Sequence, residues 1–155
     1  MIARCRAGKG TVMKIMVING PSLNMLGIRE TEIYGSGSYA ELVEYIENSA
    51  RQLGVEVVCL QSNHEGQIID WIQQAYFEGF GGIVINPGAY THTSIAIADA
   101  LRSVRPLPAV EVHISDTDTR EDYRRISFTA PCCVAQIKGL GFEGYKLAME
   151  KLLGK

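Results

Sequence analysis

The sequence predicts a single α/β domain in which helices cover both faces of a parallel sheet. Two observations support this fold class: short, nearly continuous apolar runs recur along the chain, and single segments of helical periodicity separate most of them. Strands that are buried on both faces of a parallel sheet show such continuous apolar runs. A length of 155 residues also fits one domain of ordinary size.

Five strands are predicted from the apolar runs. The first covers residues 14–19 and ends at a Gly-Pro pair. The other four cover residues 55–60, 82–86, 109–114 and 134–137.

Two of the predicted helices begin with a capping-box pattern. Ser38 and Glu41 precede a helix that Gly54 ends, and Ser62 with Glu65 opens a second helix that stops before the glycines around residue 80. The apolar positions that we expect to be buried in this second helix are Ile68, Ile69, Ile72, Ala75 and Tyr76.

Two further helices are predicted over residues 93–104 and 142–153. Strands that alternate with single helices pair in parallel through right-handed crossovers, which predicts a three-layer, flavodoxin-like sandwich with a five-stranded parallel sheet. Ligands bind such sheets beyond the carboxyl ends of the strands. We therefore expect the functional site in residues 19–34, 86–92 and 113–124.

The bulk properties exclude some functions and favour a cytoplasmic protein. The net charge of −2 provides no basic field for nucleic acid, and no apolar run is long enough to cross a membrane. The four cysteines have no spacing typical of a disulfide framework or a zinc site, so we expect reduced thiols. Residues 1–12 show no periodicity and are predicted to be a flexible extension of a domain over residues 13–155.

Four motifs carry a resemblance to a known family. They are GPSLNMLGIRE at 20–30 followed by Tyr34-Gly35, NPGAYTHTS at 86–94, EVHIS at 111–115 and Arg120-Glu121 with Arg124. In order and spacing the chain resembles the type II 3-dehydroquinate dehydratases over about residues 13–153. The resemblance implies a hydro-lyase of the shikimate pathway, or of quinate breakdown, that converts 3-dehydroquinate to 3-dehydroshikimate by anti elimination through an enolate. It implies no metal and no cofactor.

The resemblance also assigns catalytic roles. Tyr34 is expected to be the base, with Arg29 beside it to favour the phenolate. His113 is expected to be the general acid, and Glu111 can orient it because alternate residues of a strand share one face. Ser22 is expected opposite the base, near the enolate oxygen.

Binding roles follow by the same resemblance. Asp99 matches a residue that reaches the site of a neighbouring subunit, and the family assembles trimers into dodecamers. The residues expected to bind substrate in their own subunit are Asn86, Gly88, Ala89, His92, Ile114, Ser115 and Arg124.

Three positions depart from the family pattern. The family typically has asparagine at Ser22 and Asp116, and commonly histidine at Asp118. Loss of the amide at position 22 predicts slower turnover. The two carboxylates would add negative charge near the substrate carboxylate, which leaves open a divergent enzyme that acts on a related polyhydroxy cyclic acid.

The same architecture also serves functions other than catalysis. A flavin or nucleotide module lacks its phosphate-binding turn here, a phosphoacceptor domain would need an aspartate at Asn86, and a non-catalytic flavodoxin-like binding protein stays open. We expect Asn63, His64 and Glu65 to serve helix capping. The acidic residues between 116 and 122 indicate a solvated helix start rather than a calcium loop.

Overall fold

The structure is a computed structural model, and it describes residues 11–155. The predicted extension over residues 1–12 therefore lies outside the described residues, apart from its last two positions. Within residues 11–155 no helix has the length and apolar character needed to span a membrane.

Five parallel strands form one sheet in the order β2-β1-β3-β4-β5. This is the order of a flavodoxin-like fold, so the predicted fold class is confirmed, and the switch point lies between β1 and β3. β1 and β3 have the predicted bounds, β4 ends one residue earlier than predicted, and β2 and β5 are each shifted by one residue toward the C-terminus. The strands are β1 (Lys14–Asn19), β2 (Glu56–Gln61), β3 (Gly82–Asn86), β4 (Ala109–His113) and β5 (Ala135–Lys138).

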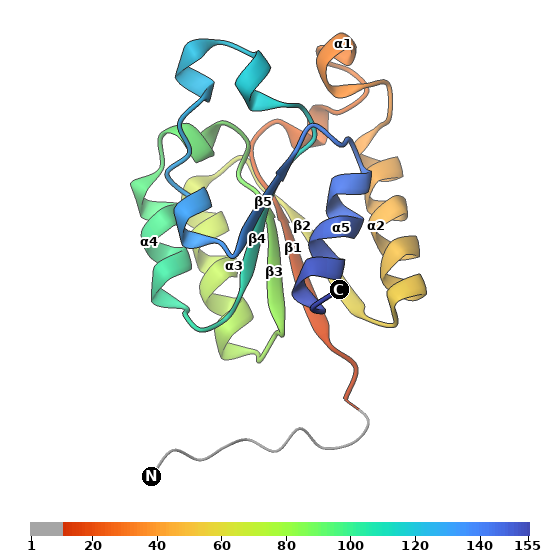
Figure 1. Ribbon diagram of the computed structural model, residues 1–155, viewed down its shortest axis with the longest axis vertical. Helices are drawn as coiled ribbons and strands as arrows, with labels where there is room; N and C mark the ends of the chain where they lie inside the picture. The colour runs from red at the N-terminus through yellow and green to blue at the C-terminus, as the bar shows by residue number, and fades with distance from the viewer. Residues whose placement is uncertain (1–10) are drawn as a thin grey trace.

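Helices cover both faces of the sheet (Figure 1). The longer helices are α2 (Tyr39–Leu53), α3 (Glu65–Phe77), α4 (Ile95–Ser103) and α5 (Glu143–Leu152). Side chains of β1 alternate between two apolar cores: Ile15 and Val17 pack with α2 and α5, whereas Met16 and Ile18 pack with α3 and α4. One face of the sheet is therefore covered by α2 and α5, and the other by α3 and α4.

The predicted capping box of α2 is present. Ser38 Oγ accepts a hydrogen bond from the backbone N–H of Glu41, and the Glu41 carboxylate accepts one from the backbone N–H of Ser38. Gly54, with φ of 73°, ends the helix.

The predicted start of α3 was wrong. The helix begins at Glu65, so this residue occupies the first helical position and cannot reach back as the third residue of a capping box. Its carboxylate instead accepts a hydrogen bond from Ser94 Oγ. His64 makes no side-chain cap, and Asn63 Oδ1 accepts a hydrogen bond from the N–H of Ser22, so these three residues do not cap the helix. Asn63 and Glu65 instead bind the segments that follow β1 and β3.

The predicted buried face of α3 was wrong at one position. Ile68, Ile72 and Ala75 are buried, Ile69 is half-buried, but Tyr76 is 50% exposed. Its ring lies edge-on against that of the exposed Phe77 in the last turn rather than against the sheet.

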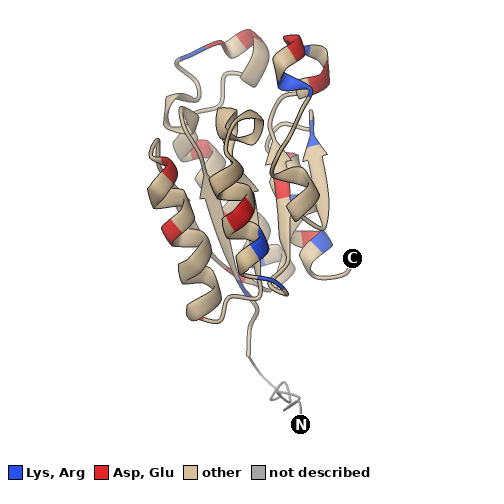
Figure 2. Cartoon of the chain, turned by 90° about the vertical axis from the view of Figure 1, so that its left-hand side faces the viewer, with Lys and Arg blue, Asp and Glu red and all other residues tan. Residues whose placement is uncertain are grey.

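The connections above the carboxyl ends of the strands contain short helical turns. The long loop after β1 carries η1 (Leu23–Met25) and α1 (Thr31–Tyr34), which stands above the sheet beside the loops that follow β4 (Figure 1). The other turns are η2 (Gly88–His92), η3 (Thr117–Thr119), η4 (Asp122–Arg124) and η5 (Ala130–Cys132). Figure 2 shows Asp and Glu on these upper loops as well as on the helices, with Lys and Arg scattered between them.

Candidate active site

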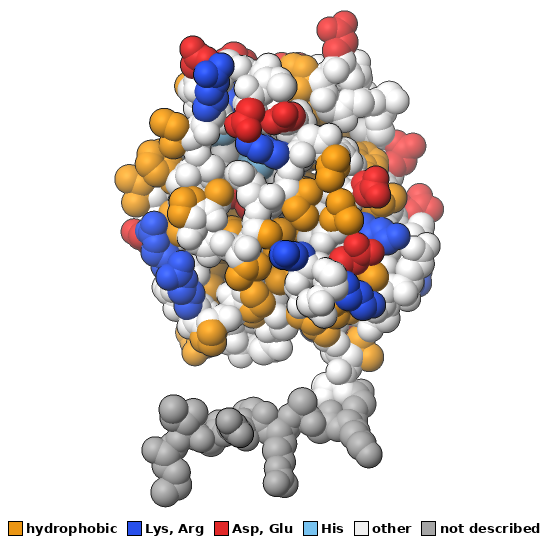
Figure 3. Space-filling model, in the orientation of Figure 1, with side chains coloured by type: hydrophobic (Ala, Val, Ile, Leu, Met, Phe, Trp, Pro, Cys, Tyr) orange, Lys and Arg blue, Asp and Glu red, His pale blue; other side chains and the backbone are white. Residues whose placement is uncertain are grey.

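The loops that follow β1, β3 and β4 enclose a cavity of about 100 Å³ at the carboxyl end of the sheet. Figure 3 shows imidazole surface in a recess below the uppermost loops, next to a basic side chain. All the predicted site residues except Glu111 and Asp99 line this cavity, namely Ser22, Arg29, Tyr34, Asn86, Gly88, Ala89, His92, His113, Ile114, Ser115 and Arg124. The structure thus brings together segments that are far apart in the sequence.

Two guanidinium groups lie against Tyr34, which is the last residue of α1. Arg120 Nη1 donates a hydrogen bond of 2.6 Å to the phenol oxygen. The Arg29 guanidinium carbon lies 4.5 Å from the centre of the phenol ring, over its face. Arg29 is therefore beside Tyr34 as expected, but the group that contacts the oxygen is Arg120.

His113, the last residue of β4, is held by a buried carboxylate. His113 Nε2 donates to Glu111 Oε1 at 2.6 Å, and the Glu111 side chain is fully buried below the cavity. Burial alone would raise the pKa of this carboxyl, but hydrogen bonds from His113, Thr129 and Gln136 outweigh it and lower the pKa to about 2. Since Nε2 is engaged by Glu111, Nδ1 is the ring nitrogen that can serve a ligand.

His92 presents one defined nitrogen to the cavity. Its Nδ1 lies 2.7 Å from the carbonyl oxygen of Ile126, which makes Nδ1 the donor and leaves Nε2 as an acceptor. Partial burial lowers the pKa of His92 below its usual value, which favours the neutral ring. A neutral His92 can accept a hydrogen bond from a hydroxyl group.

Asn86 is oriented by a buried tyrosine of α5. Asn86 Nδ2 donates to Tyr145 Oη at 2.9 Å, and the Tyr145 hydroxyl donates to Asn19 Oδ1 at 2.7 Å. Asn86 Oδ1 accepts from the N–H of Gly88 at 3.1 Å. The ends of β1 and β3 are thereby tied to one hydroxyl group, which is inaccessible to solvent.

Ser22 adopts a left-handed backbone conformation, with φ of 66° and ψ of 2°. Serine is uncommon there, whereas asparagine and glycine adopt it readily. The N–H of Ser22 donates to Asn63 Oδ1 at 2.9 Å, and Ser22 also lines the cavity. Asparagine is therefore favoured at position 22 by the left-handed backbone as well as by the hydrogen bonds that its amide could make.

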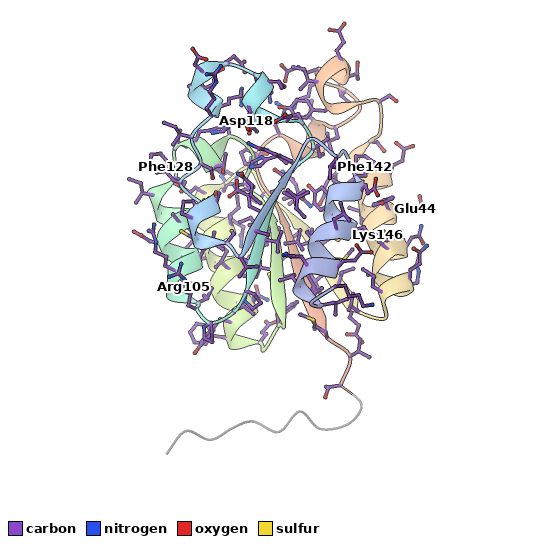
Figure 4. All side chains as sticks on the ribbon, in the orientation of Figure 1. Glu44, Arg105, Asp118, Phe128, Phe142 and Lys146 are labelled. Atoms are coloured by element: carbon purple, nitrogen blue, oxygen red, sulfur yellow. The ribbon has the colours of Figure 1, made fainter. Side chains whose placement is uncertain are left out.

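The other acidic positions do not line this cavity. The Asp116 carboxylate accepts from the N–H of Asp118 and so begins η3, as the predicted helix start implies. Asp118, labelled in Figure 4 above the end of β4, forms an ion pair with Lys138. Asp99 lies on α4 and pairs with Arg102 at 2.9 Å.

Some residues at the site had no role in the sequence prediction. Arg120 belongs to the motif Arg120-Glu121, and this motif was the only feature of the sequence that pointed to it. Tyr145 carried the ordinary pattern of a buried helix position. Ser127 and Thr129 contact Glu111 from a polar segment without periodicity, so no sequence signal could have identified them.

Comparisons with known proteins agree with this architecture. The family model for dehydroquinase class II matches residues 13–153. The 3-dehydroquinate dehydratase of Clostridium perfringens is 57% identical over 143 residues, which are 92% of this chain and 99% of that protein. The crystal structure of the type II dehydroquinase from Butyrivibrio crossotus superposes with a TM-score of 0.91 at 56% identity, covering 93% of this chain and 99% of that chain. The type II dehydroquinase from Propionibacterium acnes gives a TM-score of 0.87 at 39% identity, over 94% of this chain and 100% of the other. The chain therefore belongs to the class II dehydroquinase family.

Proposed function

We propose that this chain is a hydro-lyase that converts 3-dehydroquinate to 3-dehydroshikimate, with Tyr34 as the base and His113 as the general acid. The observation that carries the proposal is one cavity lined by both a phenol in contact with a guanidinium and an imidazole held by a buried carboxylate. Membership of the family and the names of its relatives support the choice of substrate.

The first step is removal of a proton from the carbon next to the substrate ketone. The phenolate oxygen of Tyr34 takes this proton, and the C–H electron pair forms an enolate. The positive charges of Arg29 and Arg120 favour the phenolate, and neither guanidinium loses its own proton at neutral pH. The enolate oxygen faces Ser22, whose hydroxyl can donate to it directly or through a water molecule.

The second step breaks the carbon–oxygen bond. As the enolate returns to a ketone, its electrons form the new double bond, and the departing hydroxyl takes a proton from His113 and leaves as water. Glu111 keeps the His113 ring in one orientation and stabilises its charged form. Solvent then returns a proton to His113, and Tyr34 releases the proton it took.

Polar groups around the cavity position the substrate. We assign the substrate carboxylate to Ile114 and Ser115, and the ring hydroxyls to Asn86 and to the acceptor nitrogen of His92. Arg124 clamps the far edge, and Gly88 with Ala89 allows the backbone to approach the ring closely. The proposal uses no metal or cofactor, because phenol, imidazole and guanidinium groups supply the base, the acid and the positive charge.

The alternative of a shifted substrate loses its main support. It rested on the extra carboxylates at positions 116 and 118, but neither residue lines the cavity, and Asp118 pairs with Lys138. A role for Asp99 in a neighbouring subunit, assembly into trimers and dodecamers, and a cytoplasmic location stay predictions, and sizing in solution tests the assembly.

The decisive experiment follows the enone absorbance of the product after 3-dehydroquinate is added to the purified chain. We expect catalytic turnover by the parent chain and a loss of at least about 10³-fold in Tyr34→Phe, since the variant lacks the base. An inactive parent chain overturns the proposed reaction. A Tyr34→Phe variant with the parent rate removes Tyr34 as the base.

A further inference from the structure

Among the described residues, the buried carboxylate of Glu111 accepts hydrogen bonds from four neutral side chains. Thr129 Oγ1 donates to Oε2 at 2.5 Å, and Gln136 Nε2 donates to Oε1 at 3.0 Å. Thr91 Oγ1 donates to Oε1 at 2.8 Å, and Ser127 Oγ lies 3.1 Å from the same oxygen. His113 shares Oε1 with these groups.

These donors come from three separate parts of the fold. Thr91 lies in η2, Ser127 and Thr129 lie between η4 and η5, and Gln136 stands opposite Glu111 in the β4–β5 ladder. The segment that carries Thr129 is fixed beside η2, because the N–H of Phe128 donates to the carbonyl of Thr91 at 2.8 Å. Figure 4 labels Phe128, which projects from this segment on the flank beside α4.

We propose that Thr129 and Gln136 are positioning residues, which act on the general acid His113 through the carboxylate of Glu111. Thr129 is fully buried and does not line the cavity, so it has no direct path to substrate. The inference rests on the proposed function, since it needs His113 to be the acid.

The physical effect is a division of the carboxylate charge among several donors. Each neutral donor takes part of the negative charge of Glu111 and so weakens its pull on the His113 proton. Without Thr129 or Gln136, that pull grows and the imidazolium becomes a weaker acid. Protonation of the leaving hydroxyl then slows, whereas substrate binding does not change.

Other ionisable groups also face the Glu111–His113 pair, and none of them is substituted in the variants. They are His92 from η2, Arg124 from η4, Cys133 before β5, Lys138 beside His113 in the β4–β5 ladder, and Tyr34, Arg29 and Arg120 across the cavity. Thr129 Oγ1 also lies 2.7 Å from Thr91 Oγ1, whereas the Gln136 amide donates to Glu111, so a change in the titration of His113 in Gln136→Leu reports the lost donor most directly.

The test compares Thr129→Val, which keeps the side-chain shape, with Thr129→Ser, which keeps the hydroxyl. We expect Thr129→Val to lower kcat about tenfold with KM within about twofold, and to move the alkaline limb of the kcat/KM profile to higher pH. Thr129→Ser should have the same kcat as the parent chain, and the alkaline limb of its kcat/KM profile should lie at the same pH. Gln136→Leu, at an exposed position of β5, should move the alkaline limb in the same direction as Thr129→Val.

Matched controls separate this role from simple packing. Ser49→Ala removes a buried hydroxyl on α2, and Gln74→Leu removes an exposed amide that donates to Glu78, so neither should move the limb. If the alkaline limb of the kcat/KM profile of Gln136→Leu stays at the parent pH or moves to lower pH, the proposal is overturned. So does a Thr129→Ser variant whose kcat falls as far as that of Thr129→Val overturn it.

A readout without turnover keeps the inference apart from the proposed reaction. The chain has three histidines, and their ring signals in NMR spectra of the ligand-free protein can be assigned with His64→Gln and His92→Gln. In Gln136→Leu we expect the midpoint of the pH titration of the His113 signal to move to higher pH. The midpoint of the His64 titration should not change. If the parent chain lacks activity, the reaction fails, and this titration still supports or overturns the positioning role.

Discussion

The phenol oxygen of Tyr34 accepts a hydrogen bond of 2.6 Å from Arg120, a residue 86 positions later in the chain. Tyr34 belongs to the loop after β1 and Arg120 to the loop after β4, so the contact joins the two segments that cover the cavity. Arg29 lies over the ring face of the same tyrosine at 4.5 Å. The Arg120 guanidinium also lies 5.2 Å from the ring centre, so both arginines contact the ring but only Arg120 also bonds to the oxygen.

This division predicts unequal effects of removing each charge. Arg120→Met should lower kcat by about 10²-fold or more, because the developing phenolate loses its hydrogen-bond donor as well as a charge. Arg29→Met should lower kcat less, because its charge acts through the ring. Steady-state kinetics with 3-dehydroquinate measure both, with Arg51→Met on α2 as a control for loss of a surface arginine. An Arg29→Met variant slower than Arg120→Met contradicts this division.

Ser22→Asn should raise both stability and turnover. Asparagine tolerates the left-handed backbone at this position better than serine, by roughly 0.5–1 kcal/mol of unfolding free energy, and its amide supplies a donor toward the enolate oxygen. We expect kcat to increase up to about tenfold. Enone formation and urea denaturation provide the two measurements.

Ser22→Gly separates the two effects at this position. Glycine relieves the backbone strain without supplying any side-chain donor, so stability should rise while kcat falls. Turnover that rises equally in the glycine and asparagine variants would show that only the backbone matters, and slower turnover in Ser22→Asn would contradict the donor argument.

The fold could be predicted from the sequence where local pattern and tertiary packing agree. The central strands β1 and β3 are buried on both faces, so their apolar runs match their bounds to the residue. The start of α3 could not be predicted, since the Ser62 and Glu65 pattern was complete but the Glu65 carboxylate bonds to Ser94 from the loop after β3. A local motif cannot show a competing partner 29 residues away.

Only the site residues that belong to sequence motifs could be predicted. Tyr34, His113 and Asn86 lie at or near the carboxyl ends of strands, where this fold places ligands. The contact between Arg120 and Tyr34 depends on how two loops meet, and Thr129 reaches Glu111 from a segment with no periodicity. Neither geometry follows from spacing in the sequence.

Asp118→Asn should leave substrate preference almost unchanged. The Asp118 carboxylate pairs with Lys138 and does not line the cavity, so its charge is largely balanced where it stands. We expect KM for 3-dehydroquinate to change less than about threefold. Arg124 is also ion-paired, through Nε with Glu121, but its guanidinium lines the cavity, so Arg124→Met should raise KM about tenfold or more. Measured KM values for both variants check this. A large fall in KM for Asp118→Asn would mean that the carboxylate does repel the substrate.

The depressed pKa of Glu111 makes the folded chain sensitive to acid. The folded pKa of about 2 lies below the value of 4.5 for an unperturbed carboxyl, so the unfolded chain binds the proton more tightly. The stabilisation is fully present above pH 4.5 and is lost as the pH falls from there toward 2, by up to about 3 kcal/mol. Glu111→Gln removes the titrating group, so its unfolding free energy should fall less steeply than that of the parent between pH 5 and pH 3. Urea denaturation at both pH values measures the two slopes, and equal slopes would mean that the carboxylate is not held in its ionised form by Thr129, Gln136 and His113.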